Sequence, residues 1–308
     1  MEFEVLENDL GKRLDVFLQE KFPNFSRSHI QNSIKKEDSY ILRNCKKLTK
    51  AGETIKKGDQ IFSVVNPPKE VEIRPEKVEF EIVYQDEDLA VINKPQGVVV
   101  HPCSSCPGGT LVNGLVLQLD DLSGINGELR PGIVHRIDKN TCGLLLIAKN
   151  DFAHVELSKQ IAEKTCSRKY LGLIEGAFRE QEGTVETLIG RDPKDRKKMK
   201  AFPLSDCSKN LKKAVTDYRT VEYFKDFSLI EFSLRTGRTH QIRVHAKYLN
   251  HPIVGDEVYG GAKKFGLCGQ FLCAYKIKFV HPRTKQEMEF EIELPEKFSK
   301  ILENLRKK

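Results

Sequence analysis

The chain has 308 residues, 39% of them hydrophobic and 31% charged, which is ordinary for a soluble globular protein and long enough for one large and one small domain. No apolar stretch approaches the length that crosses a bilayer, and the N-terminus lacks the basic and apolar regions of a signal peptide, so we expect no membrane contact. The 51 Lys and Arg against 44 Asp and Glu give a net charge of +7, which is compatible with nucleic-acid binding but does not require it. Eight scattered Cys favour reduced thiols and a cytoplasmic location.

Residues 1–65 are expected to form the small domain. Apolar residues fall on one helical face near its start (Leu14, Phe17, Leu18 and Phe22). Ser26 is a candidate N-cap for a second helix, in which Ile30 and Ile34 lie one turn apart. Two strand-like stretches follow and enclose a polar loop (residues 40–42 and 60–64).

Basic residues gather at the start of the second helix and in the polar loop, among them Arg27, Lys46 and Lys47. Such groups can follow an RNA backbone, which proteins recognise mainly by shape and phosphate. A solvated charged surface fits the same residues equally well, because the segment also carries many acids. Composition leaves both interpretations open.

Residues 66–78 are rich in Pro and polar side chains and are expected to be a stiff linker to a larger domain at 79–300, with a basic tail at 301–308. In the larger domain, stretches that alternate polar and apolar residues predict strands (80–84, 89–92, 170–174, 215–218 and 228–234). Two helical patterns are present (151–164, which follows Asn150, and 239–249). Few helices among many alternating strands indicate an α+β fold rather than a doubly wound parallel sheet.

One loop places an acid beside two basic side chains. His135, Arg136 and Asp138 stand together in a loop that ends at Gly143 and leads into the apolar run 144–148. A carboxylate with a neighbouring cation and a rigid strand behind it is typical of a nucleophile or an acid–base group. The alternative is that Asp138 only stabilises a turn, for which Asp is a common residue.

A second motif, residues 235–245, leaves a strand, turns at Gly237 and enters a helix. It holds three arginines and two histidines, which are costly to bury without an anion. Helical spacing predicts that Thr239 and Arg243 share a face, so that the cations converge on one point. A solvated basic helix fits poorly, because Ile242 and Val244 are interleaved at core-like positions.

Two further patterns are less specific. Nine basic and three acidic residues lie between Arg191 and Lys213, which favours contact with a polyanion. Cys103 and Cys106 have the spacing of half a zinc site, but no second pair of Cys or His at ligand spacing accompanies them. We therefore expect no metal.

The motif around Asp138, with Thr141 and Gly143, resembles the HRLDxxTSG signature of the RluA/RluD family of RNA pseudouridine synthases. Further blocks of the family's pattern follow in the same order (91–95 with Gly97 and 101–102, 130–134, 170–171 with 175–176, 190–193, 236–245, and 251–256 with 259–260). The resemblance covers residues 80 to 290, and residues 1–65 resemble an S4 RNA-binding domain. Two departures are Ile137 in place of Leu and Cys142 in place of Ser, which would place a thiol near the site.

The resemblance implies a mixed, mainly antiparallel sheet with flanking helices, and a monomeric enzyme that isomerises uridine in RNA without a metal, nucleotide or other cofactor. It implies that Asp138 is the catalytic carboxylate and Arg243 its salt-bridge partner, with Arg238 as the less favoured candidate for that partner. Tyr170 would stack on the uracil and serve in or near removal of the C5 proton. Arg136 would fill the space that the extruded uridine vacates, offsetting part of the unstacking cost. The RNA contacts expected with these residues come from His135, Arg238 and Arg191 and, in the small domain, from Arg27, Lys46 and Lys47.

The sequence leaves several alternatives open. Asp138 could attack C6, attack C1′ or take a proton from C2′. The resemblance favours large-subunit ribosomal RNA, with the helix 69 stem-loop as first choice, over another ribosomal site or tRNA. A non-catalytic RNA-binding protein would not require Asp138, Tyr170 and Arg243 together. A glycosidase would usually need two positioned carboxylates, and the sequence indicates one.

Overall fold

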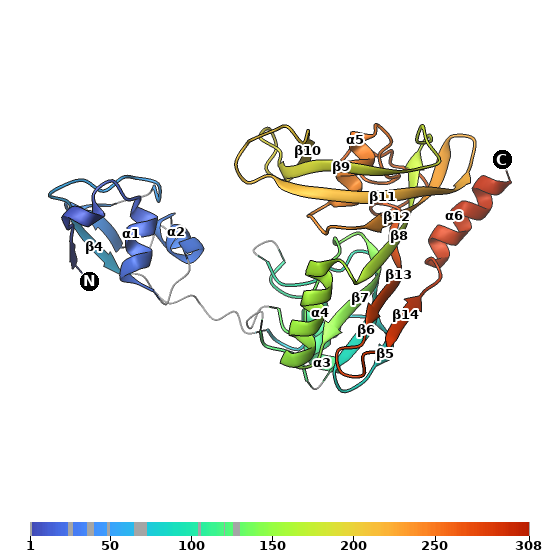
Figure 1. The fold of residues 1–308 in the computed structure, drawn as a ribbon, viewed down its shortest axis with the longest axis horizontal. Coiled ribbons are helices and arrows are strands. Elements are labelled where there is room, and N and C mark those ends of the chain that lie inside the picture. Colours follow the sequence, from blue (N-terminus) through green and yellow to red (C-terminus); the bar gives the residue numbers. More distant parts are fainter. Residues whose placement is uncertain are drawn as a thin grey trace. The chain divides into compact units, whose positions relative to one another are not determined.

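A computed structural model describes residues 2–23, 27–35, 40–47, 50–64, 73–103, 106–119, 121–125 and 130–307. The chain divides into two compact units, Met1–Val71 and Glu72–Lys308 (Figure 1). The boundary falls inside the expected linker at 66–78, of which residues 66–72 lie outside the described residues. Each unit has its own hydrophobic core, as independent domains require.

The first unit packs helices against a small antiparallel sheet. The strands lie in the order β1 (Glu2–Glu4), β4 (Gln60–Val64), β2 (Tyr40–Arg43) and β3 (Lys46–Lys47). A 3-10 turn, η1 (Glu7–Asp9), precedes α1 (Leu14–Lys21) and α2 (Arg27–Lys35). Both helices and both strand stretches stand where the sequence predicts them, and the predicted helical faces are buried at Leu14, Phe17, Leu18, Ile30 and Ile34. Ser26, the expected N-cap, lies outside the described residues.

The second unit is built on one ten-stranded sheet in the order β10-β9-β11-β12-β8-β13-β7-β6-β5, with β14 paired to β13. Only the β13–β7 pair is parallel among the strand pairs that the described residues form, so the predicted α+β class is confirmed. The strands are β5 (Glu81–Gln85), β6 (Leu89–Lys94), β7 (Cys142–Ala148), β8 (Ser167–Glu175), β9 (Glu182–Arg191), β10 (Met199–Phe202), β11 (Lys212–Tyr223), β12 (Phe227–Leu234), β13 (Leu272–Val280) and β14 (Glu287–Glu291).

Four helices cover this sheet within the described part of the unit: α3 (Leu111–Gln118), α4 (Asp151–Glu163), α5 (Gln241–Tyr248) and α6 (Glu296–Arg306). The helix α4 packs along β7, and α5 packs over β10 and β11 (Figure 1). As predicted, α4 starts after Asn150, whose side chain accepts a hydrogen bond from the Ala153 amide at 2.9 Å. No helix in the described ranges is long and apolar enough to cross a membrane.

The C-terminal residues correct one expectation. Residues 301–308 were expected to be a basic tail, but α6 continues to Arg306. Phe298, Ile301 and Leu302 recur at helical spacing and are buried, and the Phe298 ring stacks on Phe271 with 3.9 Å between ring centroids. The basic residues lie on the opposite, solvated side of an amphipathic helix, which is why the composition resembled a tail.

Candidate active site

The loop of residues 135–141, called the acidic loop below, presents Asp138 just before a buried strand. The Thr141 amide donates to the Asp138 carbonyl oxygen at 3.1 Å, which closes a turn, and β7 begins at Cys142. Gly143 has φ 113°, and a Cβ there would lie 2.3 Å from the Ala274 carbonyl oxygen, so the close approach of β7 and β13 requires glycine. The Asp138 side chain stays 18% exposed, at the rim of a pocket.

A buried lysine fixes the backbone of this loop by hydrogen bonds. Lys94, at the end of β6, is fully buried, and its Nζ donates to the carbonyl oxygens of Pro95, Val98 and Lys139 at 2.8, 2.9 and 3.0 Å. Burial lowers its pKa to about 8. The third of these bonds ties the residue after Asp138 to the sheet. The sequence contained the signal in its Asn93-Lys94-Pro95 block, but gave this lysine no role.

Arg243 joins Asp138 to a second carboxylate. Its Nη1 donates to Asp138 Oδ2 at 2.9 Å, while Nε and Nη2 donate to Asp256 Oδ2 and Oδ1 at 2.6 and 2.9 Å. Asp256 is 1% exposed, and both of its carboxylate oxygens are engaged. The two carboxylates raise the pKa of Arg243 further above its usual value, although burial opposes this. A fixed guanidinium therefore sets the position of Asp138.

The start of α5 differs from the expectation. The helix begins at Gln241, after His240 in the left-handed conformation with φ 57°, so Thr239 precedes the helix and is exposed while Arg243 is buried. Thr239 and Arg243 therefore do not share a helical face. The turn at His240 instead directs its imidazole inward, where Nδ1 lies 2.8 Å from the Tyr259 hydroxyl and Nε2 lies 3.9 Å from Asp138 Oδ1.

Tyr259 supports the same group from the other side. Its ring lies under the Arg243 guanidinium, 5.0 Å from ring centroid to Cζ, and its hydroxyl accepts from the Met199 amide at 2.9 Å. Burial raises the pKa of Tyr259 to about 12, and burial is also the main cause of the lowered pKa of His240. Both groups are thereby kept neutral around the Arg243 ion pairs.

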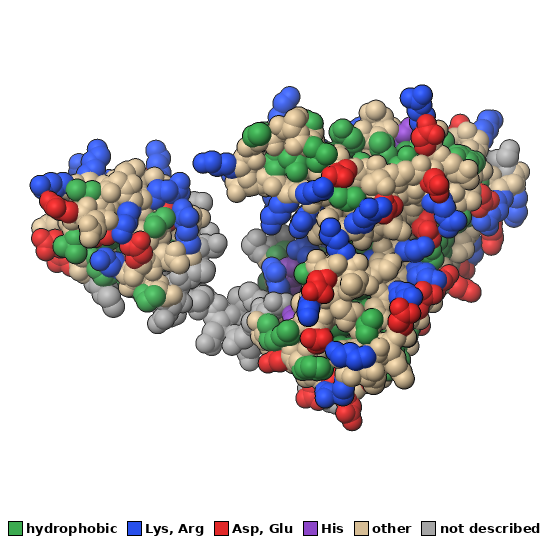
Figure 2. Space-filling model, viewed as in Figure 1, with side chains coloured by type: hydrophobic (Ala, Val, Ile, Leu, Met, Phe, Trp, Pro, Cys, Tyr) green, Lys and Arg blue, Asp and Glu red, His purple; other side chains and the backbone are tan. Residues whose placement is uncertain are grey.

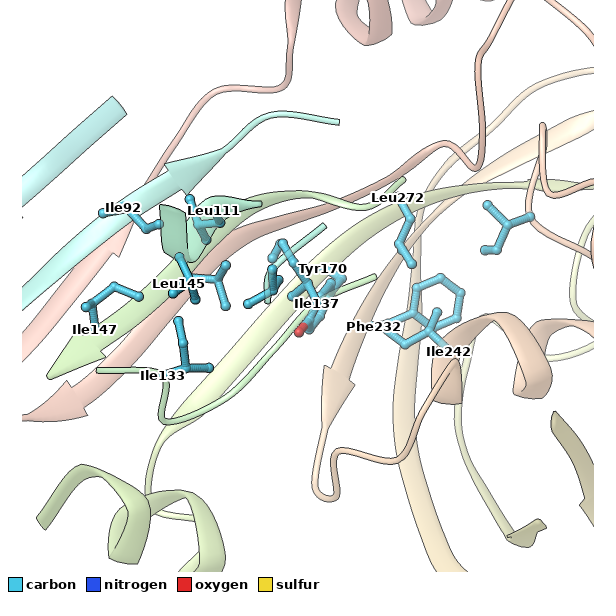
Figure 3. Close-up of a cluster of buried hydrophobic side chains, with 14 of the residues drawn as sticks. Ile92, Leu111, Ile133, Ile137, Leu145, Ile147, Tyr170, Phe232, Ile242 and Leu272 are labelled. Atoms are coloured by element: carbon cyan, nitrogen blue, oxygen red, sulfur yellow. The ribbon is translucent and has the colours of Figure 1, made fainter. Parts of the chain in front are cut away.

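Tyr170 lies on β8 within the apolar cluster that includes Ile137 and Ile242 (Figure 3). Burial raises its pKa to about 12, so the phenol stays protonated near neutral pH. Tyr170, Asp138 and Arg243 all line one pocket of about 350 Å³, which is a size suited to a small planar group.

The pocket is rich in cations. Figure 2 shows Lys and Arg side chains around a hollow between the part of this unit that holds β9–β11 and the part that holds α4. Among its lining residues, Arg235 pairs with Asp217 at 2.6 Å, whereas four cations form no ion pair with a carboxylate of the described residues (Arg136, Lys164, Arg168 and Arg238). Two of these, Arg136 and Arg238, were predicted from the sequence. Such an excess favours a polyanionic ligand.

The other residues predicted to contact RNA do not all reach this pocket. The His135 Nε2 accepts from the Leu146 amide at 3.0 Å and burial lowers its pKa to about 3, so a neutral ring braces the loop on β7. Arg191 is exposed at the end of β9, where Nη1 donates to the Arg196 carbonyl oxygen at 3.0 Å. It is not among the residues that line the pocket.

The three basic residues of the small domain occupy its surface. Arg27 donates from Nε to Asp15 Oδ2 at 3.1 Å, and Lys46 and Lys47 are exposed on β3. Arg27 is therefore partly neutralised by a buried acid. The two lysines lie at the surface of the domain.

None of the described cysteines lines this pocket. Cys142 is buried beside Leu173 and Phe271 and does not line the pocket, so the expected thiol near the site is absent from the pocket wall. Cys103 and Cys106 form a backbone bridge in which each amide donates to the other's carbonyl oxygen at 2.9 and 3.0 Å. The described residues contain no cluster of three or more His, Cys, Asp or Glu that could hold a metal.

Comparison with known proteins agrees with this geometry. The model of the RNA pseudouridylate synthase family matches residues 88–248. A Bacillus subtilis protein named uncharacterized RNA pseudouridine synthase YlyB is 44% identical over 98% of this chain and 96% of its own length. The ribosomal large subunit pseudouridine synthase D of Escherichia coli K12 is 36% identical over 98% of this chain and 93% of its own length. A solved structure, human RNA pseudouridylate synthase domain containing 4, aligns with TM-score 0.58 and 26% identity over 73% of this chain and 93% of that protein.

Proposed function

The chain belongs to the RNA pseudouridine synthase family, and we propose that it isomerises uridines of large-subunit ribosomal RNA with Asp138 as its catalytic carboxylate. The observation that carries the proposal is the ion triad of Asp138, Arg243 and Asp256 at the rim of a cation-lined pocket. A protein that only binds RNA has no need for a carboxylate fixed inside its anion-binding pocket. A glycosidase would need a second available carboxylate, and both oxygens of Asp256 are already engaged.

The reaction breaks the C1′–N1 bond, turns the uracil and joins C1′ to C5, after which N1 gains a proton and C5 loses one. No electrons enter or leave, so the residues need only supply charge, a proton acceptor and a base-holding surface. Asp138 Oδ2 is held by Arg243, while Oδ1 makes no hydrogen bond among the described residues and lies 3.9 Å from His240 Nε2. Attack on C1′, attack on C6 and removal of the C2′ proton all use this free oxygen.

The remaining roles follow from placement. The buried ring of Tyr170 is suited to stack on the uracil. Its phenol, with a pKa of about 12, stays protonated near neutral pH, so the hydroxyl would have to give up its own proton before it could take one from C5. Arg136 is exposed on the acidic loop, where it can enter the space left by an extruded uridine. Arg238 and Arg168 line the same pocket and can meet phosphates.

Two considerations favour the ribosomal substrate. The relative from Escherichia coli is named for the large ribosomal subunit and aligns with nearly the whole chain, the small domain included. We propose that this S4-like unit grips RNA through its exposed lysines while the catalytic unit extracts a loop uridine, which costs least to unstack. The helix 69 stem-loop is the first choice, and we propose that the enzyme acts on it in the cytoplasm as a monomer.

The test replaces Asp138 by Asn. We expect Asp138→Asn to abolish release of tritium from RNA labelled at uridine C5 and to leave RNA affinity within a few-fold of the parent, because affinity comes mainly from phosphate contacts. Asp226→Asn is the matched control, since Asp226 is exposed and outside the pocket. An active Asp138→Asn enzyme, purified free of host synthases, would refute the assignment. Pseudouridine sequencing in a strain without the gene tests helix 69, and intact modification there would exclude it.

A further inference from the structure

Arg168 is buried, whereas the other three pocket cations without an ion pair are exposed. It stands at the start of β8, is 6% exposed and lines the pocket. Its guanidinium forms no ion pair with any carboxylate of the described residues, and its Nε is buried without a hydrogen-bond partner there. The charge is therefore enclosed by protein but not neutralised by it.

The surroundings of Arg168 leave room for the guanidinium without supplying an acid. Across from it lies Gly237, where a Cβ would stand 3.2 Å from Arg168 Nη1. The one carboxylate that lines the pocket, Asp138, is held by Arg243. A buried, unpaired guanidinium is costly, and the cost is offset when an anionic ligand binds beside it.

The position of Arg168 on its strand indicates which anion this is. Arg168 and Tyr170 alternate with the more exposed Ser167 and Lys169, so they point to the same face of β8. Two residues along a strand span about 7 Å. That spacing resembles the reach from a nucleobase to the phosphate of its own nucleotide. A guanidinium also matches phosphate oxygens with two parallel hydrogen bonds.

We propose that Arg168 binds the phosphodiester adjacent to the extruded uridine and so fixes the sugar over Asp138. The inference rests on the proposed function, because it takes the uracil to lie on Tyr170. Arg168 is thus a substrate-binding residue inside the pocket, distinct from the outer cations that contact RNA beyond the target nucleotide. It selects for a nucleotide within a chain over a free base or nucleoside.

The experiment pairs a protein change with a phosphate change. Arg168→Met is assayed on RNA hairpins that carry a single neutral methylphosphonate, placed either on one side of the target uridine, on the other side, or several nucleotides away. We expect Arg168→Met to lower kcat/KM roughly 10- to 100-fold on unmodified RNA. One methylphosphonate next to the uridine should cost the parent enzyme a similar factor and cost Arg168→Met almost nothing further.

Controls separate this contact from general effects. Arg219→Met removes an exposed arginine outside the pocket and should leave both substrates' rates near the parent values. Arg168→Lys retains the charge and should recover part of the loss, and thermal melting identifies variants that are unfolded at the assay temperature.

Two results are decisive against the inference. If the loss of kcat/KM caused by Arg168→Met multiplied with the loss caused by the methylphosphonate at each tested position, Arg168 would contact no adjacent phosphate. A parent enzyme that releases no tritium from any hairpin or from ribosomal RNA would refute the proposed function, and the inference with it. If the parent enzyme releases tritium and the two losses multiply, only the inference about Arg168 is refuted and the proposed function stands.

Discussion

Asp256 provides the sharpest test of how the site is held, because it never needs to touch RNA. Replacement of Asp256 by Asn removes one negative charge and turns an acceptor oxygen into an NH₂ group that faces a guanidinium N–H. One of the two hydrogen bonds, at 2.6 and 2.9 Å, is then lost and the other becomes weaker. Breaking a buried ion pair costs about 3–5 kcal/mol of folding stability.

The free-energy cost of breaking this ion pair predicts a change in both the melting temperature and kcat. For a unit of this size, about 3–5 kcal/mol corresponds to a fall in melting temperature of roughly 6–20 °C. A hydrogen bond to a charged group contributes about 1.5–3 kcal/mol, and if that is lost from the positioning of Arg243, kcat falls roughly 10- to 150-fold. We expect Asp256→Asn to show this fall in kcat when tritium release is assayed roughly 20–30 °C below the variant's own melting temperature. Its KM should stay close to that of the parent.

The matched control is Asp88→Asn. Asp88 is also buried and accepts two hydrogen bonds from one arginine, Arg283, at 2.7 and 2.5 Å, but it lies outside the pocket. Asp88→Asn should lower stability and leave kcat unchanged. If both variants lost activity equally, general destabilisation would explain the result. If Asp256→Asn kept the parent kcat while folded, Arg243 would not depend on Asp256 for its position.

Three further predictions concern other parts of the chain. Tyr170→Phe should keep RNA affinity within a few-fold and slow turnover, because the ring remains while the hydroxyl is removed; an unchanged rate in single-turnover tritium release would exclude the hydroxyl from the chemistry. Deletion of residues 1–71 should weaken binding to ribosomal RNA and reduce its salt dependence, while the remaining unit still isomerises a loop uridine slowly; filter binding over a salt series measures this, and an unchanged salt slope would contradict it. His245, buried between the hydroxyls of Thr216 and Thr187 at 2.8 and 3.0 Å, has its pKa lowered by burial to about 4. The unfolded state binds this proton below about pH 6.5 and the folded state does not, so stability falls with falling pH, by about 2 kcal/mol at pH 5. His245→Gln should show a shallower loss in urea denaturation between pH 7.5 and 5, and an equal loss would rule out His245 as the source.

The sequence identified the parts of the site that lie in short, contiguous motifs. Asp138 and Arg136 stand three residues or fewer from His135, and Arg243 follows Arg238 within one strand-turn-helix segment. The structure brings Asp138 and Arg243 together as the resemblance implied. The pairing itself came from the resemblance, because the local pattern left open that Asp138 only stabilises a turn.

What the sequence did not reveal depends on contacts between distant segments. Asp256 stands in the block 251–256 of the family's pattern, but nothing in the sequence indicates that this acid pairs with Arg243. Arg168 looks like any basic residue that opens a strand, and only its burial without a partner distinguishes it. The left-handed turn at His240 was missed as well, because the helix was expected to begin at Thr239, two residues before its start at Gln241.

The second carboxylate also explains how an acid stays usable in a pocket full of cations. If Arg243 met Asp138 alone, the pair would be neutral and both carboxylate oxygens could be drawn to guanidinium. Because Asp256 takes Nε and Nη2, one N–H direction of Arg243 remains for Asp138, and the triad carries a net charge of −1. Under the proposed function, the pocket cations that form no ion pair among the described residues are left for RNA phosphates, which neutralise them as the substrate enters. Under the proposed function, affinity and chemistry then depend on different charges: phosphates meet the outer arginines, and Oδ1 of Asp138, which makes no hydrogen bond among the described residues, is left for the sugar or base.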